Sequence, residues 1–332
     1  MSTQSTLFTR REWLAALGAA TLAARARPVA LAAETKPMEG AFMILSTPYT
    51  ASNEVHHADL ERQVDFLDRC GVHGLVWPQN SSEQRYLSKT ERLAGMDTIA
   101  AAARGKRPAL VFGVQADDTE GMLEYARHAE TLQPDGLIAI PPTSAGSLDD
   151  FRAYYEALSQ VTSRPVFIQT SGGAPDIEPT VDFIVKMATE FPNLAYVKEE
   201  RAPVHERMRG LAMHRPGRIK RIFGAAFGRA WLYEMRLGTD GVMTGGAMYA
   251  DIYARLWELH RAGEAAELRD VFGKLLLMLN LDATIPGVRL YMLKKRGIFS
   301  TTKSRRGDYT FSAQDVAEIE YRWEGLAPYL RA

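Results

Sequence analysis

The sequence predicts a (β/α)8 TIM barrel with a C-terminal helical extension, and its order of elements supports this fold class. From about residue 40 onward, eight short apolar runs alternate with longer amphipathic stretches, as expected of parallel strands joined by helices. The eight units take about 220 residues, close to the usual size of such a barrel. A doubly wound sheet is the competing prediction, and it is disfavoured because no G-x-G-x-x-G motif follows the first run.

Each apolar run has the length of a strand in a buried parallel sheet. In chain order the expected strands are residues 41–46, 74–77, 109–113, 136–140, 166–169, 194–198, 221–224 and 241–244. The expected barrel helices are residues 57–70, 89–104, 118–132, 148–161, 178–190, 203–213, 227–237 and 249–261. Polar residues near helix starts and glycines near helix ends support these bounds, namely Asp117, Ser147, Glu178, Gly71, Gly105 and Gly238.

Beyond the eighth unit the pattern is helical only. The expected helices there are residues 262–280, 285–295 and 312–329. Ser312, followed by Asp315, is typical of a helix N-terminus, while the polar and basic segment 297–310 is expected to be a loop. The predicted organisation is a signal peptide over residues 1–33, a barrel over 38–262 and a helical region over 263–332.

The N-terminus predicts export rather than a membrane anchor. Arg10 and Arg11 precede a short, weakly apolar run over residues 15–24, and small residues up to Ala33 offer a cleavage site. The arginine pair resembles a twin-arginine export signal, which implies a periplasmic location. A transmembrane anchor is disfavoured because the run is far shorter than the roughly 20 residues that span a bilayer.

Composition excludes several other functions. The chain is 46% hydrophobic and 24% charged with a formal net charge of zero, so no basic field indicates a nucleic-acid partner. Removal of residues 1–33, with four arginines and one glutamate, would leave a net charge of −3. Cys70 is the only cysteine, so no intramolecular disulfide can form. None of the seven histidines lies in an H-x-H or H-E-x-x-H spacing, so no metal site is predicted.

Lys198 is the residue that points most directly to chemistry. It closes the sixth expected strand and precedes Glu199 and Glu200. A buried amine becomes a nucleophile that can form a Schiff base with a carbonyl substrate. The alternative interpretation is a surface lysine just past the strand end, paired with one of the two glutamates.

The active site of a TIM barrel lies at the carboxyl ends of its strands. The residues expected there are hydroxyls, amides and glycines around Lys198, namely Gln79–Ser82, Thr143, Ser144, Gln169–Gly173 and Thr244–Gly246. Donors of this kind can hold a small carboxylate while an amine attacks the neighbouring ketone.

Over residues 38–330 the chain resembles the dihydrodipicolinate synthase and N-acetylneuraminate lyase family of Schiff-base aldolases. Residues 193–199 are similar to that family's strand-six lysine motif, and residues 80–83 lie where the family has its Gly-Thr-Thr-Gly-Glu loop. Residues 285–292 are similar to its C-terminal Pro-Lys-Met helix. The order and spacing of the three segments carry the resemblance.

The resemblance implies a role for each matching residue. Lys198 would form the imine with pyruvate or another 2-keto acid, and no separate cofactor would be needed. Asn80 and Ser81 would bind the substrate carboxylate, and the backbone around Met243 would help to close the pocket. Gln169 and Thr244 are expected to contact substrate from the ends of their strands. Glu83 matches a family glutamate that is mainly structural.

Two departures from the family pattern concern the loop after strand four. The family tyrosine that shuttles protons there is matched by Thr143, whose hydroxyl is a far weaker acid than a phenol with a pKa of about 10. Thr143 is therefore expected to act in catalysis by positioning a water or the substrate carboxylate as the proton carrier. Tyr86 is a weak candidate for the missing phenol. The arginine that holds the second substrate in the synthase branch is absent, so a role in lysine biosynthesis is disfavoured.

Two functional hypotheses follow. The first is an exported lyase, aldolase or dehydratase that acts on a 2-keto acid through Lys198. The second is a catalytically weakened barrel that binds a small keto acid or sugar acid, and the loss of the tyrosine motivates it. The resemblance also implies a homo-oligomer, either a tetramer or a dimer.

Overall fold

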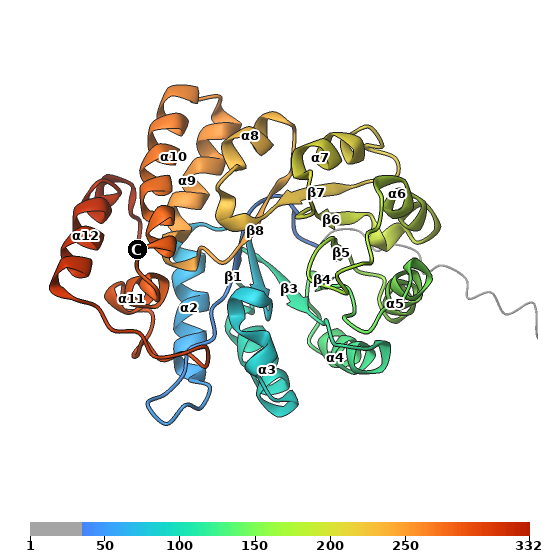
Figure 1. Ribbon diagram of the computed structural model, residues 1–332, viewed down its shortest axis with the longest axis horizontal. Helices are drawn as coiled ribbons and strands as arrows, with labels where there is room; N and C mark the ends of the chain where they lie inside the picture. The colour runs from blue at the N-terminus through green and yellow to red at the C-terminus, as the bar shows by residue number, and fades with distance from the viewer. Residues whose placement is uncertain (1–34) are drawn as a thin grey trace, which may run out of the picture.

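The computed structural model describes residues 35–332 and confirms the predicted barrel, a closed ring of eight parallel strands (Figure 1). The predicted signal peptide lies outside the described residues. The strands are β1 (Gly40–Ile44), β2 (Gly74–Trp77), β3 (Ala109–Gly113), β4 (Gly136–Ala139), β5 (Val166–Gln169), β6 (Tyr196–Lys198), β7 (Arg221–Gly224) and β8 (Gly241–Thr244). Each strand pairs with the next, and β8 pairs with β1, so the ring has no open edge.

Helices cover the outside of the ring. They are α2 (His57–Cys70), α3 (Lys89–Ala103), α4 (Thr119–Thr131), α5 (Leu148–Val161), α6 (Val181–Glu190), α7 (Val204–Ala212), α8 (Trp231–Arg236) and α9 (Ala250–Ala262). The C-terminal region adds α10 (Ala265–Leu279), α11 (Val288–Lys295) and α12 (Ala313–Glu324), which gather on one side of the barrel (Figure 1). No helix within residues 35–332 combines the length and apolar character that crossing a membrane requires.

Several helices are shorter than the sequence pattern predicts, among them α6, α8 and α12. Helix α6 begins after Thr180, whose hydroxyl accepts a hydrogen bond from the amide of Phe183 and so caps the helix, rather than at residue 178. Helix α8 begins only at Trp231, because a 3-10 turn that includes Phe227 at a φ of 56° precedes it. Helix α12 ends at Glu324 and is followed by a separate 3-10 turn that contains Pro328.

An aromatic layer fills the barrel interior beneath the carboxyl ends of the strands. The ring of Phe223 lies 5.0 Å from that of Phe42 and 5.2 Å from that of Phe167, although the three come from β7, β1 and β5. A Cβ on Gly74 would come within 2.2 Å of the Phe42 ring, so this glycine makes room for the layer. Because side chains two residues apart share a face of a strand, Lys198 points inward one layer above Tyr196.

Candidate active site

Lys198 is buried, with 4% of its surface exposed. Its Nζ donates a hydrogen bond to Oε1 of Gln169 over 3.1 Å and lies 3.3 Å from Oε1 of Glu200. The same lysine lines a cavity of about 290 Å³ at the carboxyl end of the barrel. The interpretation as a surface lysine is therefore wrong about exposure, although the ion pair with Glu200 does form.

The register of the barrel places Gln169 beside the lysine. Strands β5 and β6 pair in parallel with Gln169 directly opposite Lys198. The amide nitrogen of Gln169 donates to the carbonyl of Ser171 over 3.2 Å, which leaves its oxygen to accept from the ammonium group. Gln169 therefore positions the Nζ of Lys198.

The two glutamates after Lys198 have different surroundings. Glu199 is fully buried, accepts from the Thr170 hydroxyl over 2.6 Å and lies 3.1 Å from Nε of Arg207. Glu200 instead lines the lysine cavity, where its second carboxylate oxygen accepts from the Ser171 hydroxyl over 2.8 Å. Glu199 thus ties the strand end to its neighbours, while Glu200 presents a carboxylate to the cavity.

The expected carboxylate-binding residues lie in a 3-10 turn after β2. This turn, Asn80–Ser82, presents Asn80 and Ser81 to the cavity that holds Lys198. Met243, Thr244 and Gly245 line the same cavity from β8 and the loop that follows it. A Cβ on Gly245 would come within 2.4 Å of the Ser81 hydroxyl oxygen, so the absence of a side chain at 245 allows the two loops to meet.

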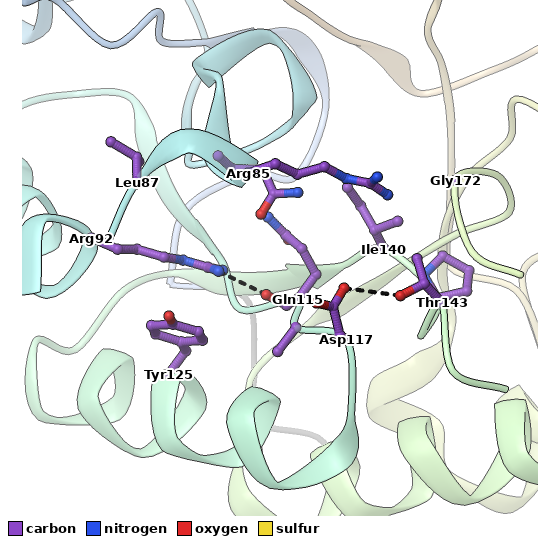
Figure 2. Close-up of a pocket in the computed structure, with 12 residues that line it drawn as sticks. Arg85, Leu87, Arg92, Gln115, Asp117, Tyr125, Ile140, Thr143 and Gly172 are labelled. Atoms are coloured by element: carbon purple, nitrogen blue, oxygen red, sulfur yellow. Dashed lines mark hydrogen bonds between the residues drawn. The ribbon is translucent and has the colours of Figure 1, made fainter. Parts of the chain in front are cut away.

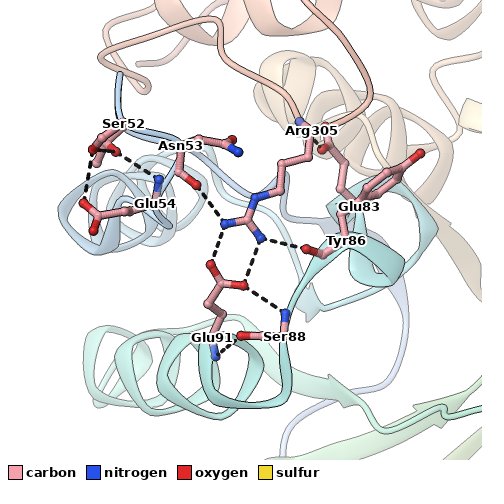
Figure 3. A network of polar contacts seen from close by, with 9 residues as sticks. Ser52, Asn53, Glu54, Glu83, Tyr86, Ser88, Glu91 and Arg305 are labelled. Atoms are coloured by element: carbon pink, nitrogen blue, oxygen red, sulfur yellow. Dashed lines mark hydrogen bonds and ion pairs between the residues drawn. The ribbon is translucent and has the colours of Figure 1, made fainter.

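Glu83 is structural, as predicted. Its carboxylate accepts from the Ser304 hydroxyl over 2.6 Å and from the amide of Arg305 over 2.9 Å. Arg305 in turn pairs with Glu91 at the start of α3 and donates to the carbonyl of Tyr86 (Figure 3). These contacts hold the loop of residues 297–310 against the loop after β2, and so bring C-terminal residues to the active site.

The structure does not bring Thr143 together with Lys198. Thr143 lines a second cavity of about 310 Å³, where its hydroxyl donates to Oδ1 of Asp117 over 2.9 Å (Figure 2). Buried Arg92 lines the same cavity, and burial lowers the pKa of its guanidinium to about 10. Tyr86 is exposed and contributes to neither cavity. Neither residue lines the cavity of Lys198, so the catalytic role expected of Thr143 stays a prediction.

The sequence reasoning missed several residues of the lysine cavity, namely Glu200, Phe227, Arg289 and Arg306. Arg289 lies inside the C-terminal segment that carried part of the family resemblance, and Arg306 lies in the loop noted only as polar and basic. The basic composition of segment 297–310 was the feature of the sequence that could have indicated Arg306 as a cavity residue. Within residues 35–332 no group of three potential metal ligands lies close enough together to hold an ion.

Fold and site together define a TIM-barrel protein with a buried lysine at the carboxyl end of its sixth strand. The chain belongs to the dihydrodipicolinate synthetase family, whose model matches residues 37–306. This match spans all eight strands and the loop that carries Arg306.

Relatives cover nearly the whole chain at low identity. An uncharacterized DapA-like lyase of Thermococcus kodakarensis is 24% identical over 85% of this chain and 97% of its own length. A probable 2-dehydro-3-deoxy-D-pentonate aldolase of Escherichia coli is 22% identical over 73% of this chain and 80% of its own. The crystal structure of dihydrodipicolinate synthase from Rhodopseudomonas palustris superposes with a TM-score of 0.78 at 22% identity, covering 89% of this chain and all of that one.

Proposed function

We propose that the protein is a lyase that forms an imine between Lys198 and pyruvate or another 2-keto acid. The observation that carries the proposal is that Lys198 is buried and lines a cavity of about 290 Å³, with its Nζ next to the carboxylate of Glu200 and the amide of Gln169. Family membership supports it, and so do relatives described as an aldolase and as dihydrodipicolinate synthases. Pyruvate is the simplest acid to test.

The proposed first step is the loss of water at the keto carbon. Lys198 passes a proton to Glu200, and its neutral amine attacks C2. A proton then moves from the attacking nitrogen to the keto oxygen, which becomes the hydroxyl of a carbinolamine. Glu200 returns the proton to this hydroxyl, which leaves as water, and an iminium on Lys198 remains. Asn80 and Ser81 are proposed to hold the substrate carboxylate meanwhile.

The iminium then acts as an electron sink. Removal of a C3 proton gives an enamine that can attack an aldehyde, and cleavage of a C3–C4 bond delivers its electron pair to the same enamine. A dehydratase would use this enamine to expel a hydroxyl group from C4. Met243 and Thr244 line the cavity and are proposed to shape the space for the substrate.

Glu200 is proposed as the group that moves the protons. Its Oε1 lies 3.3 Å from the Nζ of Lys198, so a small movement of either side chain brings the two atoms to hydrogen-bond distance for proton transfer. The Ser171 hydroxyl holds the other carboxylate oxygen in place. Thr143 matches the position of the family's proton-shuttling tyrosine, but its hydroxyl donates to Asp117 and lines the other cavity. A carboxylate next to the lysine would supply the function of the phenol that the chain lacks.

Export and assembly are further parts of the proposal. The arginine pair and the small residues up to Ala33 support twin-arginine export to the periplasm, and the family resemblance supports a homo-oligomer. N-terminal sequencing of the protein recovered from a periplasmic fraction should begin near Ala33 or Glu34. A mature chain that keeps Met1 would overturn the export proposal.

Borohydride trapping tests the imine. The protein is incubated with pyruvate and borohydride, digested, and examined by mass spectrometry for a pyruvate-derived mass gain on Lys198. Lys198→Ala should lose the adduct, while Lys186→Ala on the exposed face of α6 should keep it. If neither pyruvate nor a panel of 2-keto acids adds mass at Lys198, the proposal fails. An adduct without turnover of any aldol substrate would favour the weakened, binding-only barrel.

A further inference from the structure

Two arginines line the cavity of Lys198, and the proposed imine chemistry assigns them no role. Arg289 comes from the first turn of α11, and Arg306 comes from the loop between α11 and α12. Neither belongs to the eight strands. Both are brought to the cavity by the C-terminal region, which Glu83 and Arg305 fasten to the barrel.

Arg289 is held in one orientation. Its Nε lies 3.3 Å from Oδ1 of Asp282, and its guanidinium lies 4.6 Å from the centre of the Phe227 ring. Asp282 is shared, because Nη2 of Arg229 also lies 3.6 Å from it. One carboxylate therefore stands between two guanidinium groups, and positive charge remains at this edge of the cavity.

Arg306 has no anionic partner within the described part of the chain. Its guanidinium donates to the backbone carbonyl of Asn80, and within residues 35–332 no carboxylate oxygen lies within 4.0 Å of it. Its backbone amide donates to the Ser304 hydroxyl over 3.0 Å, which anchors the residue at the cavity wall. A guanidinium that lines a cavity and forms no ion pair can bind a ligand anion.

The balance of charge decides what kind of ligand fits. The cavity is lined by three cations, Lys198, Arg289 and Arg306, and by one carboxylate, that of Glu200. The carboxylate of a 2-keto acid offsets one of the two surplus positive charges, and the lysine keeps its charge as an iminium. One more negative charge on the ligand would then balance the remaining positive charge. A second carboxylate supplies one such charge, whereas a phosphate dianion would supply more than one.

A second, smaller cavity adjoins the lysine cavity at the two arginines. Its volume is about 70 Å³, and it shares Ser81, Arg289 and Arg306 with the lysine cavity. Its remaining polar lining consists of Ser46, Ser304 and Tyr309 together with two carboxylates, those of Glu83 and Asp282. Glu83 accepts from Ser304 and Asp282 pairs with Arg289, so both carboxylates have partners within the protein, and a ligand carboxylate is expected on the lysine side of the two arginines.

We propose that the substrate is a 2-keto acid with a second carboxylate at its far end, which Arg306 and Arg289 bind. The inference rests on the proposed imine at Lys198 and names the class of substrate that reaches it. Arg306 supplies a guanidinium that forms no ion pair within residues 35–332, and Arg289 supplies one fixed by Asp282 and Phe227.

Matched pairs of keto acids test the inference. The pairs are 2-oxoglutarate with 2-oxopentanoate and 2-oxoadipate with 2-oxohexanoate, which differ only by the terminal carboxylate. For each acid, the concentration that gives half-maximal borohydride adduct at Lys198 is measured by mass spectrometry. We expect at least one diacid to need about tenfold less than its partner, the effect of one charge-assisted contact of about 1.4 kcal/mol.

Arginine variants show whether the preference comes from this site. Arg306→Gln should reduce the ratio between diacid and monoacid to below about threefold, and Arg306→Lys should keep part of it. Arg218→Gln, on the exposed surface after α7, is the matched control and should leave the ratio unchanged. Arg289→Gln is the second variant, and circular dichroism checks that each variant is folded.

Four results would overturn the inference while the proposed function stands. In the first, each diacid and its monoacid partner reach half-maximal adduct at the same concentration; in the second, pyruvate is trapped but neither diacid is. In the third, the preference for the diacid survives in both Arg306→Gln and Arg289→Gln. In the fourth, Arg218→Gln loses the preference as much as the cavity variants do. Absence of any adduct at Lys198, with pyruvate as well as with the longer acids, would instead overturn the proposed function itself. The two failures are therefore distinguishable.

Discussion

Glu234 is expected to make the protein lose stability as the pH rises through neutrality. Its carboxyl is buried beneath β7, where a Cβ on Gly224 would come within 1.9 Å of Oε2. Burial raises the pKa of Glu234 to about 7 from its ordinary value of 4.5. His205 is the only basic side chain that the structure places within 4.0 Å of this carboxyl among residues 35–332, with its Nε2 at 3.7 Å.

The size of the effect follows from the shift in pKa. Because the folded pKa lies above the unfolded one, the folded state binds the proton more tightly, and this stabilisation is complete below about pH 4.5. It is lost as the pH rises through 7. A shift of 2.5 pH units at 1.36 kcal/mol each corresponds to about 3 kcal/mol of unfolding free energy between pH 4 and pH 8.

Glu234→Gln removes the titrating group with little change of shape. Relative to the wild type, the variant should gain about 3 kcal/mol of unfolding free energy between pH 4 and pH 8, whatever constant offset the amide introduces. Urea unfolding followed by tryptophan fluorescence measures this, and buried Trp231 on the same helix is a local reporter. His205→Asn is the control, since it removes the titratable neighbour and should leave the pH dependence in place. Curves for Glu234→Gln and wild type that stay parallel across this range would refute the reasoning.

Three further predictions concern the active site and the aromatic layer beneath it. Glu200→Gln should slow the exchange of pyruvate methyl protons with solvent deuterium by about 100-fold or more, the usual contribution of a general base, whereas Glu124→Gln on the outer face of α4 should not. Exchange at the wild-type rate would remove Glu200 from the mechanism. Gly245→Ala should raise the pyruvate concentration for half-maximal trapping by about tenfold, because its Cβ would displace Ser81; unchanged trapping would mean that the two loops move apart freely. Phe223→Ala should lower the unfolding free energy by about 3–5 kcal/mol in urea, since it empties the aromatic layer, and a loss below 1 kcal/mol would contradict the packing described.

Much of the fold could be read from local patterns. All eight strand predictions fall within two residues of the observed bounds, and β6 begins at Tyr196 rather than at residue 194 because a 3-10 turn occupies Pro192–Leu194. Helix ends were harder to place, since they depend on single contacts such as the Thr180 cap and on the positive φ at Phe227. Those contacts do not alter the periodicity of hydrophobic residues, so the sequence pattern could not reveal them.

The candidate site was predictable to the extent that it follows from strand order. Lys198, Gln169 and Thr244 end their strands, and the ends of parallel strands share one rim. Thr143 also follows a strand, yet its side chain turns toward Asp117 in a neighbouring cavity. Position along the chain therefore placed residues on the rim without deciding which cavity each one enters.

The sequence by itself determined the barrel, its family and the lysine at the end of strand six, because alternation of apolar runs and spacing of motifs are properties of the chain. Only the tertiary structure decided that Lys198 is buried against Glu200 and that Arg289 and Arg306 share its cavity. The physical reason is that the two arginines lie about 90 residues or more from Lys198 in sequence, and that the exposure of a lysine depends on the loops packed over it. Long-range contacts, above all that of Glu83 with Ser304 and Arg305, set their positions around the lysine.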